Sequence, residues 1–210
     1  MGDVLLKMRN IDKIFPGVKA LSNVDFTLRA GEIHSLMGEN GAGKSTLIKV
    51  LTGVYHRDGG TITLNGKEIS PNNPKEAQEC GISTVYQEVN LCPNLTVAEN
   101  IFIGREPKKF GFIDWKQINK RSADLLNSLN IHIDVTKTLD HYSVAIQQMI
   151  AIARAVDVDA KILILDEPTS SLDEEETKRL FSIIRQLQKK GMGIIFISHL
   201  KERRFQPQCH

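Results

Sequence analysis

An α/β fold with a mainly parallel sheet is predicted by three features of the sequence. Apolar runs that suit buried strands alternate along the chain with helical patterns. The run at 161–165 is almost continuously apolar, which is typical of a parallel strand covered on both faces. A glycine-rich loop at 38–46 joins an apolar run at 33–37 to a helix-compatible segment at 47–51. In such a fold the ligand binds at the carboxyl ends of the strands.

Short strands with tight turns open the chain and predict an antiparallel sheet beside the glycine-rich loop. Residues 4–8 are β-like, a turn is expected at Phe15-Pro16-Gly17, and residues 24–28 alternate with period two. Later, residues 61–64 and 67–69 flank Asn65-Gly66, which is a strong hairpin signal.

Helical patterns dominate residues 91–156, and we interpret this segment as an inserted helical subdomain. Helices are expected at 96–102, 115–129 and 144–156, and Ser143 is well placed as the N-cap of the last. No strand-rich stretch interrupts this segment. A short helix from Pro74 and a strand at 82–86 precede it, and a helix at 174–190 and a buried strand at 193–198 follow the run at 161–165. We therefore expect residues 1–90 and 157–200 to form the core with its antiparallel β subdomain.

Composition restricts the possible partners. The 210 residues are 41% hydrophobic, and the net charge of +2 is spread without a long basic stripe, which argues against nucleic acid. Cys80, Cys92 and Cys209 lack the spacing of a disulfide framework or a metal site. No apolar run reaches the roughly 18 residues of a membrane span, so the chain is not expected to cross a membrane by itself.

The glycine-rich loop fully matches the pattern GxxxxGK[ST]. Its residues are Gly38, Glu39, Asn40, Gly41, Ala42, Gly43, Lys44, Ser45 and Thr46. Backbone N–H groups in such a loop, and the positive end of the following helix, attract phosphate oxygens. Lys44 would reach the β and γ phosphates of a nucleotide, and the Ser45 hydroxyl would bind the accompanying Mg²⁺. The alternative, a glycine-rich turn with an accidental Lys-Ser, does not explain the flanking strand and helix.

Two carboxylates follow the apolar run at 161–165. Asp166 is placed to hold Mg²⁺ through its water shell, and Glu167 is placed to polarise an attacking water. The alternative is that the pair only begins a turn with Pro168.

Three further residues have an open role at this stage. Gln87, at the expected end of the strand at 82–86, offers an amide oxygen to Mg²⁺ or water, or is structural. His199 either donates a hydrogen bond to the γ phosphate or is an ordinary hydrogen-bonded neighbour. Phe15 either stacks on a base or packs locally.

Taken in order, these motifs resemble the nucleotide-binding domain of ABC transporters. The ordered set is Phe15, GENGAGKST, the strand end at Gln87, Ser143 at a helix start, ILILDEP, Ser171-Leu172-Asp173 and Ser198-His199. In detail the chain is similar to the amino-terminal ATPase half of bacterial monosaccharide importers of the ribose, galactose and galactofuranose group. The segments FPGVKAL and TVYQEVNLCPNLTVAENIFIGREP are most similar to the galactofuranose-type branch.

The resemblance implies ATP and Mg²⁺ as ligands, with a P-loop NTPase fold of the ABC type. It implies an adenine platform at Phe15, Mg²⁺ contacts from Ser45, Gln87 and Asp166, Glu167 as the catalytic carboxylate and His199 as the switch histidine. Ser171, Leu172 and Asp173 would form the D-loop. Residues after Gln87 and the helical subdomain would contact membrane-spanning subunits.

One motif departs from the family pattern, because Tyr142-Ser143-Val144-Ala145-Ile146 stands where most members carry LSGGQ. Ser143 and the helix N-terminus that would face a partner's γ phosphate remain, but Val144 and Ala145 should hinder close backbone approach. We expect one competent composite site, completed by a partner's signature, and one weaker site that contains Ser143. The alternative is that Ser143 is only a helix cap.

The sequence thus predicts an ATPase domain that powers sugar import from the cytoplasmic face of a bacterial inner membrane. The expected partners are a second ABC ATPase domain, fused in the natural protein, and permease subunits, with an indirect link to a periplasmic or extracellular sugar-binding protein. A soluble ABC-type ATPase acting on ribosomes or DNA, or a nucleotide-binding module without turnover, are the alternatives. The atypical segment 201–210 lacks the helix and strands that the family shows there, so we expect a C-terminally incomplete domain, through truncation or a frameshift.

Overall fold

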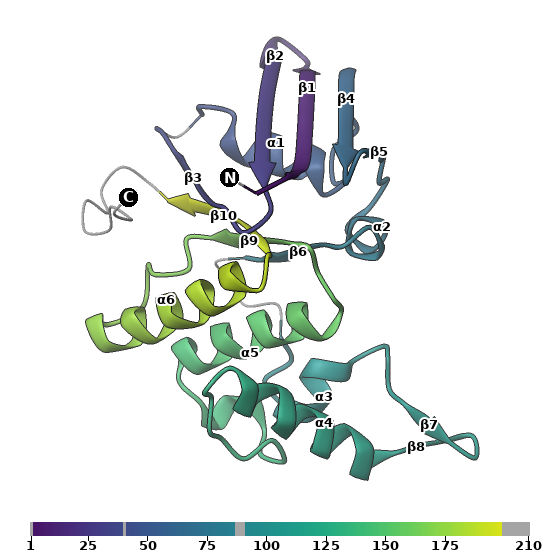
Figure 1. The fold of residues 1–210 in the computed structure, drawn as a ribbon, viewed down its shortest axis with the longest axis vertical. Helices are drawn as coiled ribbons and strands as arrows, with labels where there is room; N and C mark the ends of the chain where they lie inside the picture. The colour runs from purple at the N-terminus through teal and green to yellow at the C-terminus, as the bar shows by residue number, and fades with distance from the viewer. Residues whose placement is uncertain (1, 40, 87–90, 199–210) are drawn as a thin grey trace.

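Two four-stranded β-sheets, a small two-stranded sheet and the helices around them make up the computed structural model, which describes residues 2–39, 41–86 and 91–198 (Figure 1). Four predictions of the sequence analysis, for Asn40, Gln87, His199 and the segment 201–210, lie outside these residues. The α/β class with one parallel and one antiparallel sheet is confirmed.

The antiparallel sheet has the strand order β2-β1-β4-β5. Its strands are β1 (Val4–Phe15), β2 (Val18–Arg29), β4 (Gly59–Leu64) and β5 (Lys67–Glu68). β1 and β2 are longer than the sequence predicted, because register shifts, one of them between Met8 and Ile11, keep the strands paired where the period-two pattern is interrupted. Asn10 and Asn23 have positive φ angles of 51° and 53° near these shifts, which asparagine tolerates better than most residues.

The parallel sheet has the strand order β3-β10-β9-β6. Its strands are β3 (Ile33–Met37), β10 (Gly193–Ser198), β9 (Ile162–Asp166) and β6 (Ile82–Val85). Consecutive side chains of β9 enter different cores: Ile162 and Ile164 pack on the side of the antiparallel sheet, and Leu163 and Leu165 on the opposite side. Burial on both faces explains why this strand is apolar throughout.

Helices cover both faces of the parallel sheet. On one side, the core is shared with the antiparallel sheet and with α1 (Lys44–Leu51) and α2 (Pro74–Glu79). The other side packs against the remaining four helices, α3 (Val97–Phe102), α4 (Trp115–Ser128), α5 (Val144–Asp157) and α6 (Glu174–Lys189). In Figure 1 the antiparallel sheet, the parallel sheet, the pair α5–α6 and the pair α3–α4 follow one another down the long axis.

The helical segment contains a small hairpin of two-residue strands, which the sequence analysis did not predict. It consists of β7 (Lys108–Lys109) and β8 (Phe112–Ile113), and a short 3₁₀ helix, η1 (Leu139–His141), also occurs. Two-residue strands are too short to give a period-two pattern, and the turn Phe110-Gly111 carries a single glycine as a signal. No described helix is long and apolar enough to cross a membrane.

Candidate active site

The glycine-rich loop connects β3 to α1 and ends at Gly43, the N-cap of the helix. Gly43 has φ 80°, and a Cβ atom there would lie 3.0 Å from the Ala20 carbonyl oxygen, so only glycine suits this position. No side chain caps α1, and its first helical bond runs from the Leu47 N–H to the Gly43 oxygen. The N–H groups of the three preceding residues therefore have no partner within the helix, and this end of α1 is suited to bind an anion.

Lys44 is folded across its own loop. Its Nζ donates hydrogen bonds to the carbonyl oxygens of Gly38 at 2.5 Å and Glu39 at 2.9 Å. These bonds hold the ammonium group inside the loop, where phosphate oxygens could replace the neutral carbonyl acceptors. The adjacent Ser45 is exposed at the start of the helix.

Glu167 has a left-handed backbone conformation directly after β9. Its φ is 47°, which costs a residue other than glycine about 1–2 kcal/mol. The conformation is held because the Glu167 N–H donates to the Ile197 oxygen at 3.0 Å, and the Glu167 oxygen accepts from the Ser170 N–H at 3.3 Å. Strain of this kind gathers at functional sites, and the sequence pattern did not reveal it.

The register of the parallel sheet brings the loop and the carboxylates to one edge. Met37, the last residue before the loop, pairs with Ser198 on β10, and Ile197 on β10 pairs with Asp166 at the end of β9. β10 therefore lies between the strand that carries the loop and the strand that carries Asp166-Glu167. The described residues do not include Gln87 and His199, which follow β6 and β10 in the sequence.

Phe15 lies at the end of β1, in the hairpin that approaches the glycine-rich loop. Its half-buried ring meets the Tyr55 ring edge-on, with centroids 5.1 Å apart, and Lys13 Nζ lies 5.5 Å from its centroid. The Ala20 carbonyl of the same hairpin lies against Gly43. Contacts with Tyr55 and Lys13 thus account for part of the burial of the Phe15 ring. Its role as an adenine platform stays a prediction.

The altered signature begins α5. Ser143 is the N-cap, and its Oγ accepts a hydrogen bond from the Ile146 N–H at 3.5 Å. Val144 is 46% exposed, whereas Ala145 is 2% exposed. Of the two residues that replace glycine, only Val144 therefore presents its side chain on the surface, and the methyl group of Ala145 faces the core.

Glu176, in the first turn of α6, contacts both Ser143 of the altered signature and Asp173 before the helix. The sequence analysis missed this role. Asp173 and Glu176 form a capping box, in which the Glu176 N–H donates to Asp173 Oδ1 at 2.8 Å. Glu176 Oε1 also accepts a hydrogen bond from Ser143 Oγ at 3.3 Å. The spacing D-x-x-E before an amphipathic helix was the available signal. Of the neighbouring residues, Ser171 is exposed and Leu172 packs against the core.

We expect Glu176→Ala to lower the free energy of unfolding by about 1 kcal/mol, because it removes the capping box and the contact with Ser143. Glu175→Ala is the matched control, since it removes the same charge from the first turn of α6 but has no part in the capping box. Urea denaturation of both variants measures the difference. Equal losses would show that only the charge near the helix N-terminus matters.

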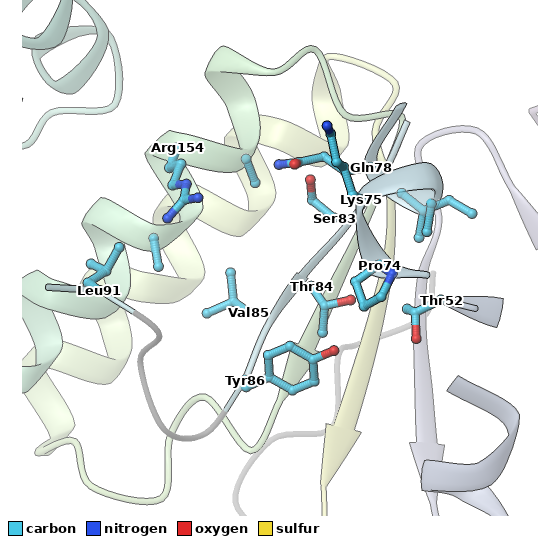
Figure 2. Close-up of a pocket in the computed structure, with 14 residues that line it drawn as sticks. Thr52, Pro74, Lys75, Gln78, Ser83, Thr84, Val85, Tyr86, Leu91 and Arg154 are labelled. Atoms are coloured by element: carbon cyan, nitrogen blue, oxygen red, sulfur yellow. The ribbon is translucent and has the colours of Figure 1, made fainter. Parts of the chain in front are cut away.

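A pocket of about 310 Å³ lies along β6, between β6, α2 and α5 (Figure 2). Arg154 extends into it from α5, and Ser83 and Tyr86 line it from β6 and the residue that follows β6. Within the described part of the chain, the Arg154 guanidinium has no hydrogen bond or ion pair, and the buried Ser83 Oγ has no hydrogen-bond partner. Burial, and then the charge of Arg105, lower the pKa of Arg154. The pocket is therefore suited to receive an acidic group.

The fold and the site define a P-loop nucleotide-binding domain, with a phosphate loop and two carboxylates at one edge of a parallel sheet. A family model described as ABC transporter matches residues 21–170, and the chain belongs to this family.

Known relatives and solved structures agree with this assignment. The chain is 56% identical over 202 residues to the galactofuranose transporter ATP-binding protein YtfR of Escherichia coli K12, which covers 96% of this chain and 40% of that protein. It is 50% identical to the ribose import ATP-binding protein RbsA of Geobacillus kaustophilus, and the match covers 96% of this chain and 41% of that protein. The chain thus spans about 40% of the length of these relatives.

Among solved structures, an ATP-binding cassette of an ABC transporter in its ADP conformation has a TM-score of 0.82 at 27% identity, covering 94% of this chain and 82% of that chain. A nucleotide-free cassette has the same TM-score at 26% identity and the same coverage. The ABC-type P-loop fold predicted from the sequence is thereby confirmed.

Proposed function

We propose that this chain binds Mg-ATP and that, in the complete protein, its hydrolysis of ATP powers import of a monosaccharide through an ABC transporter. The observation that supports the proposal is the shared sheet edge, at which the strand before the loop of Lys44 and the strand that ends at Asp166 lie on either side of β10. The identity to sugar import relatives supports the transport role, and the 56% identity to YtfR favours a galactofuranose-type importer.

The residues at this edge fit a nucleotide with its magnesium ion. The ammonium group of Lys44 and the unpaired N–H groups at the start of α1 would hold the phosphates. The Ser45 hydroxyl and the Asp166 carboxylate, with Gln87, would hold Mg²⁺, which would neutralise charge on the β and γ phosphates. The described residues contain no cluster of three or more His, Cys, Asp or Glu side chains that could hold a metal ion.

Glu167 is the proposed general base. A water attacks the γ phosphorus, a new P–O bond forms as the bond to the β-phosphate oxygen breaks, and the proton of the water passes to the Glu167 carboxylate. His199 would donate a hydrogen bond to the γ phosphate. The held backbone of Glu167 supports this assignment, because a fixed carboxylate needs little reorganisation during the reaction.

A second ABC ATPase domain would complete the site. The relatives are more than twice as long as this chain, which leaves room for a fused second domain that supplies a fuller signature. The exposed Val144 supports the expectation that the reciprocal site, with Ser143, is the weaker one. ATP would close the two domains face to face, and hydrolysis would reopen them.

Permease subunits are the proposed partners at the pocket between β6, α2 and α5, with a periplasmic or extracellular sugar-binding protein acting indirectly. This arrangement would hold the chain at the cytoplasmic face of the inner membrane. Support comes from Arg154, since a carboxylate on a permease helix would form an ion pair with its half-buried guanidinium group. The pocket also adjoins Tyr86, the last described residue before Gln87, so movement of the permease could reach the catalytic edge.

We expect Arg154→Met to weaken association with the permease about 10- to 100-fold, because it removes a charge-assisted contact and keeps the apolar stem. Arg185→Met, on the exposed side of α6, is the control and should bind as the unaltered chain does. Pull-down of the complete protein by its detergent-solubilised permease measures the effect. If the Arg154 variant associates with the permease as tightly as the unaltered chain does, the pocket is not part of the interface.

The proposed function is tested by transport itself. The complete protein with its permease and binding protein is placed in vesicles, and uptake of labelled pentoses and hexoses is followed with and without Mg-ATP. Uptake of one sugar that requires ATP is the expected result. ATP hydrolysis without uptake of any sugar in the panel would contradict the import role and favour another ABC ATPase function.

A further inference from the structure

A hairpin with exposed aromatic side chains projects from the helical part of the molecule. It comprises residues 108–115, here named the aromatic hairpin, and it stands clear of the neighbouring helices in Figure 1. Phe110 is 90% exposed, Phe112 80% and Trp115 49%. Three large, exposed aromatic side chains within one short segment are unusual for a protein surface that contacts only water.

The aromatic hairpin has a defined conformation. Lys109 pairs with Phe112 across the turn, in which Phe110 and Gly111 have φ angles of 52° and 87°. Its base is fixed because the Asp114 N–H donates to the Pro107 oxygen at 2.9 Å, and Asp114 Oδ1 accepts from the Gln117 N–H at 3.0 Å as the cap of α4. The rings are therefore presented on a small ordered scaffold.

Positive charge surrounds these rings. Within residues 105–121 there are six lysine and arginine residues and two carboxylates, although the whole chain has a net charge of only +2. The two arginines pair with Asp157, and the carboxylates bond to backbone N–H groups at Gly104 and in α4. The remaining cations have no ion pair within the described residues, and all are exposed: Lys108, Lys109, Lys116 and Lys120.

We propose that the aromatic hairpin inserts its rings into the interfacial region of an anionic phospholipid bilayer. Phe110, Phe112 and Trp115 would lie at the level of the headgroups and upper acyl chains, and the four lysines would contact lipid phosphates. A bilayer is favoured over a protein partner because the apolar surface is a convex tip. Rings on such a tip need a matching pocket in a protein, whereas lipid adapts to their shape.

The inference rests on the proposed function, since a domain docked on a permease works next to the bilayer. It adds a direct lipid contact made by this chain. Such a contact would orient the helical part of the domain relative to the membrane and raise the local concentration of the chain at its permease.

Trp115 is the only tryptophan of the chain and lies at the base of the aromatic hairpin, so its fluorescence reports insertion. The full chain is titrated with vesicles of phosphatidylcholine alone and of phosphatidylcholine with phosphatidylglycerol. We expect a blue shift, and quenching by lipids brominated on their acyl chains, with the anionic vesicles at low salt. Binding should fall about tenfold or more in molar salt, where lysine–lipid attraction is screened.

Paired variants assign the effect to the hairpin. Phe110→Ala/Phe112→Ala and Lys108→Glu/Lys109→Glu should each weaken vesicle binding at least about tenfold. Lys189→Glu/Lys190→Glu, at the end of α6, carries the same charge change and should bind as the unaltered chain does. Far-UV circular dichroism confirms that each variant is folded.

Three results would overturn the proposal: no fluorescence change with anionic vesicles, equal weakening by the control pair, or loss of permease binding by the phenylalanine variant with vesicle binding intact. The last result would show that the aromatic hairpin contacts a protein and not lipid. Calorimetry with Mg-ATP separates this failure from failure of the proposed function, because a chain that binds ATP but not vesicles loses only the lipid contact.

Discussion

Replacing Glu167 with glutamine is expected to lower ATP hydrolysis by the assembled transporter about 10²- to 10⁴-fold, while Mg-ATP still binds. Glutamine has nearly the same size and can keep the backbone bond from residue 167 to the Ile197 oxygen. Its amide cannot take the proton of the attacking water. Phosphate release by the complete protein in its transporter, and calorimetry with Mg-ATP, measure the two parts of this prediction.

Glu174→Gln is the matched control for this change, since it neutralises an exposed carboxylate in the first turn of α6. We expect it to hydrolyse ATP normally. The positive φ at position 167 is equally unfavourable for glutamate and glutamine. The Glu167→Gln variant and the unaltered chain should therefore have the same free energy of unfolding within about 0.5 kcal/mol. Hydrolysis that survives Glu167→Gln would assign the general base to another group.

The parallel sheet was predictable because its signal is local. β9 and β10 are apolar at nearly every position, since both of their faces enter a core, and each is followed in the sequence by a polar residue suited to chemistry. The phosphate loop was equally clear, because GxxxxGK[ST] between a strand and a helix is a continuous pattern. For the same reason the N-cap Ser143 and the hairpin at Asn65-Gly66 appear where the sequence places them.

The remaining features depend on contacts between distant segments. Nothing near Arg154 in the sequence indicates that its side chain lines the same pocket as Ser83 on β6, about seventy residues away. The positive φ of Glu167 is set by a bond to β10. The exposure of Phe110 and Phe112 is apparent only in the three-dimensional arrangement. Local patterns therefore predicted which residues meet at this edge of the parallel sheet, and the structure was needed for the surfaces that would contact partners.

Lys44→Ala is expected to weaken Mg-ATP binding by about 10²-fold. The ammonium group would make charge-assisted contacts to the phosphates, and a loss of about 3 kcal/mol corresponds to this change in affinity. Lys49→Ala is the control, because Lys49 lies on the same helix but its Nζ is 5.3 Å from the Tyr55 ring centroid, away from the loop. Calorimetry with the full chain measures both affinities. Similar affinities for the Lys44 variant and the unaltered chain would contradict the assigned role.

Thermal unfolding with and without ATP tests whether the effect of Lys44 arises at the ligand. Without ATP, the hydrogen bonds of Lys44 Nζ among the described residues go to the neutral carbonyls of its own loop, so both variants should lie within about 1 kcal/mol of the unaltered chain. At an ATP concentration of about 100 Kd, the unaltered chain and Lys49→Ala should each gain about 2.7 kcal/mol from binding. Lys44→Ala, then near its own Kd, should gain only about 0.4 kcal/mol. A Lys44 variant that is already less stable by several kcal/mol without ATP would show instead that this lysine holds the loop together.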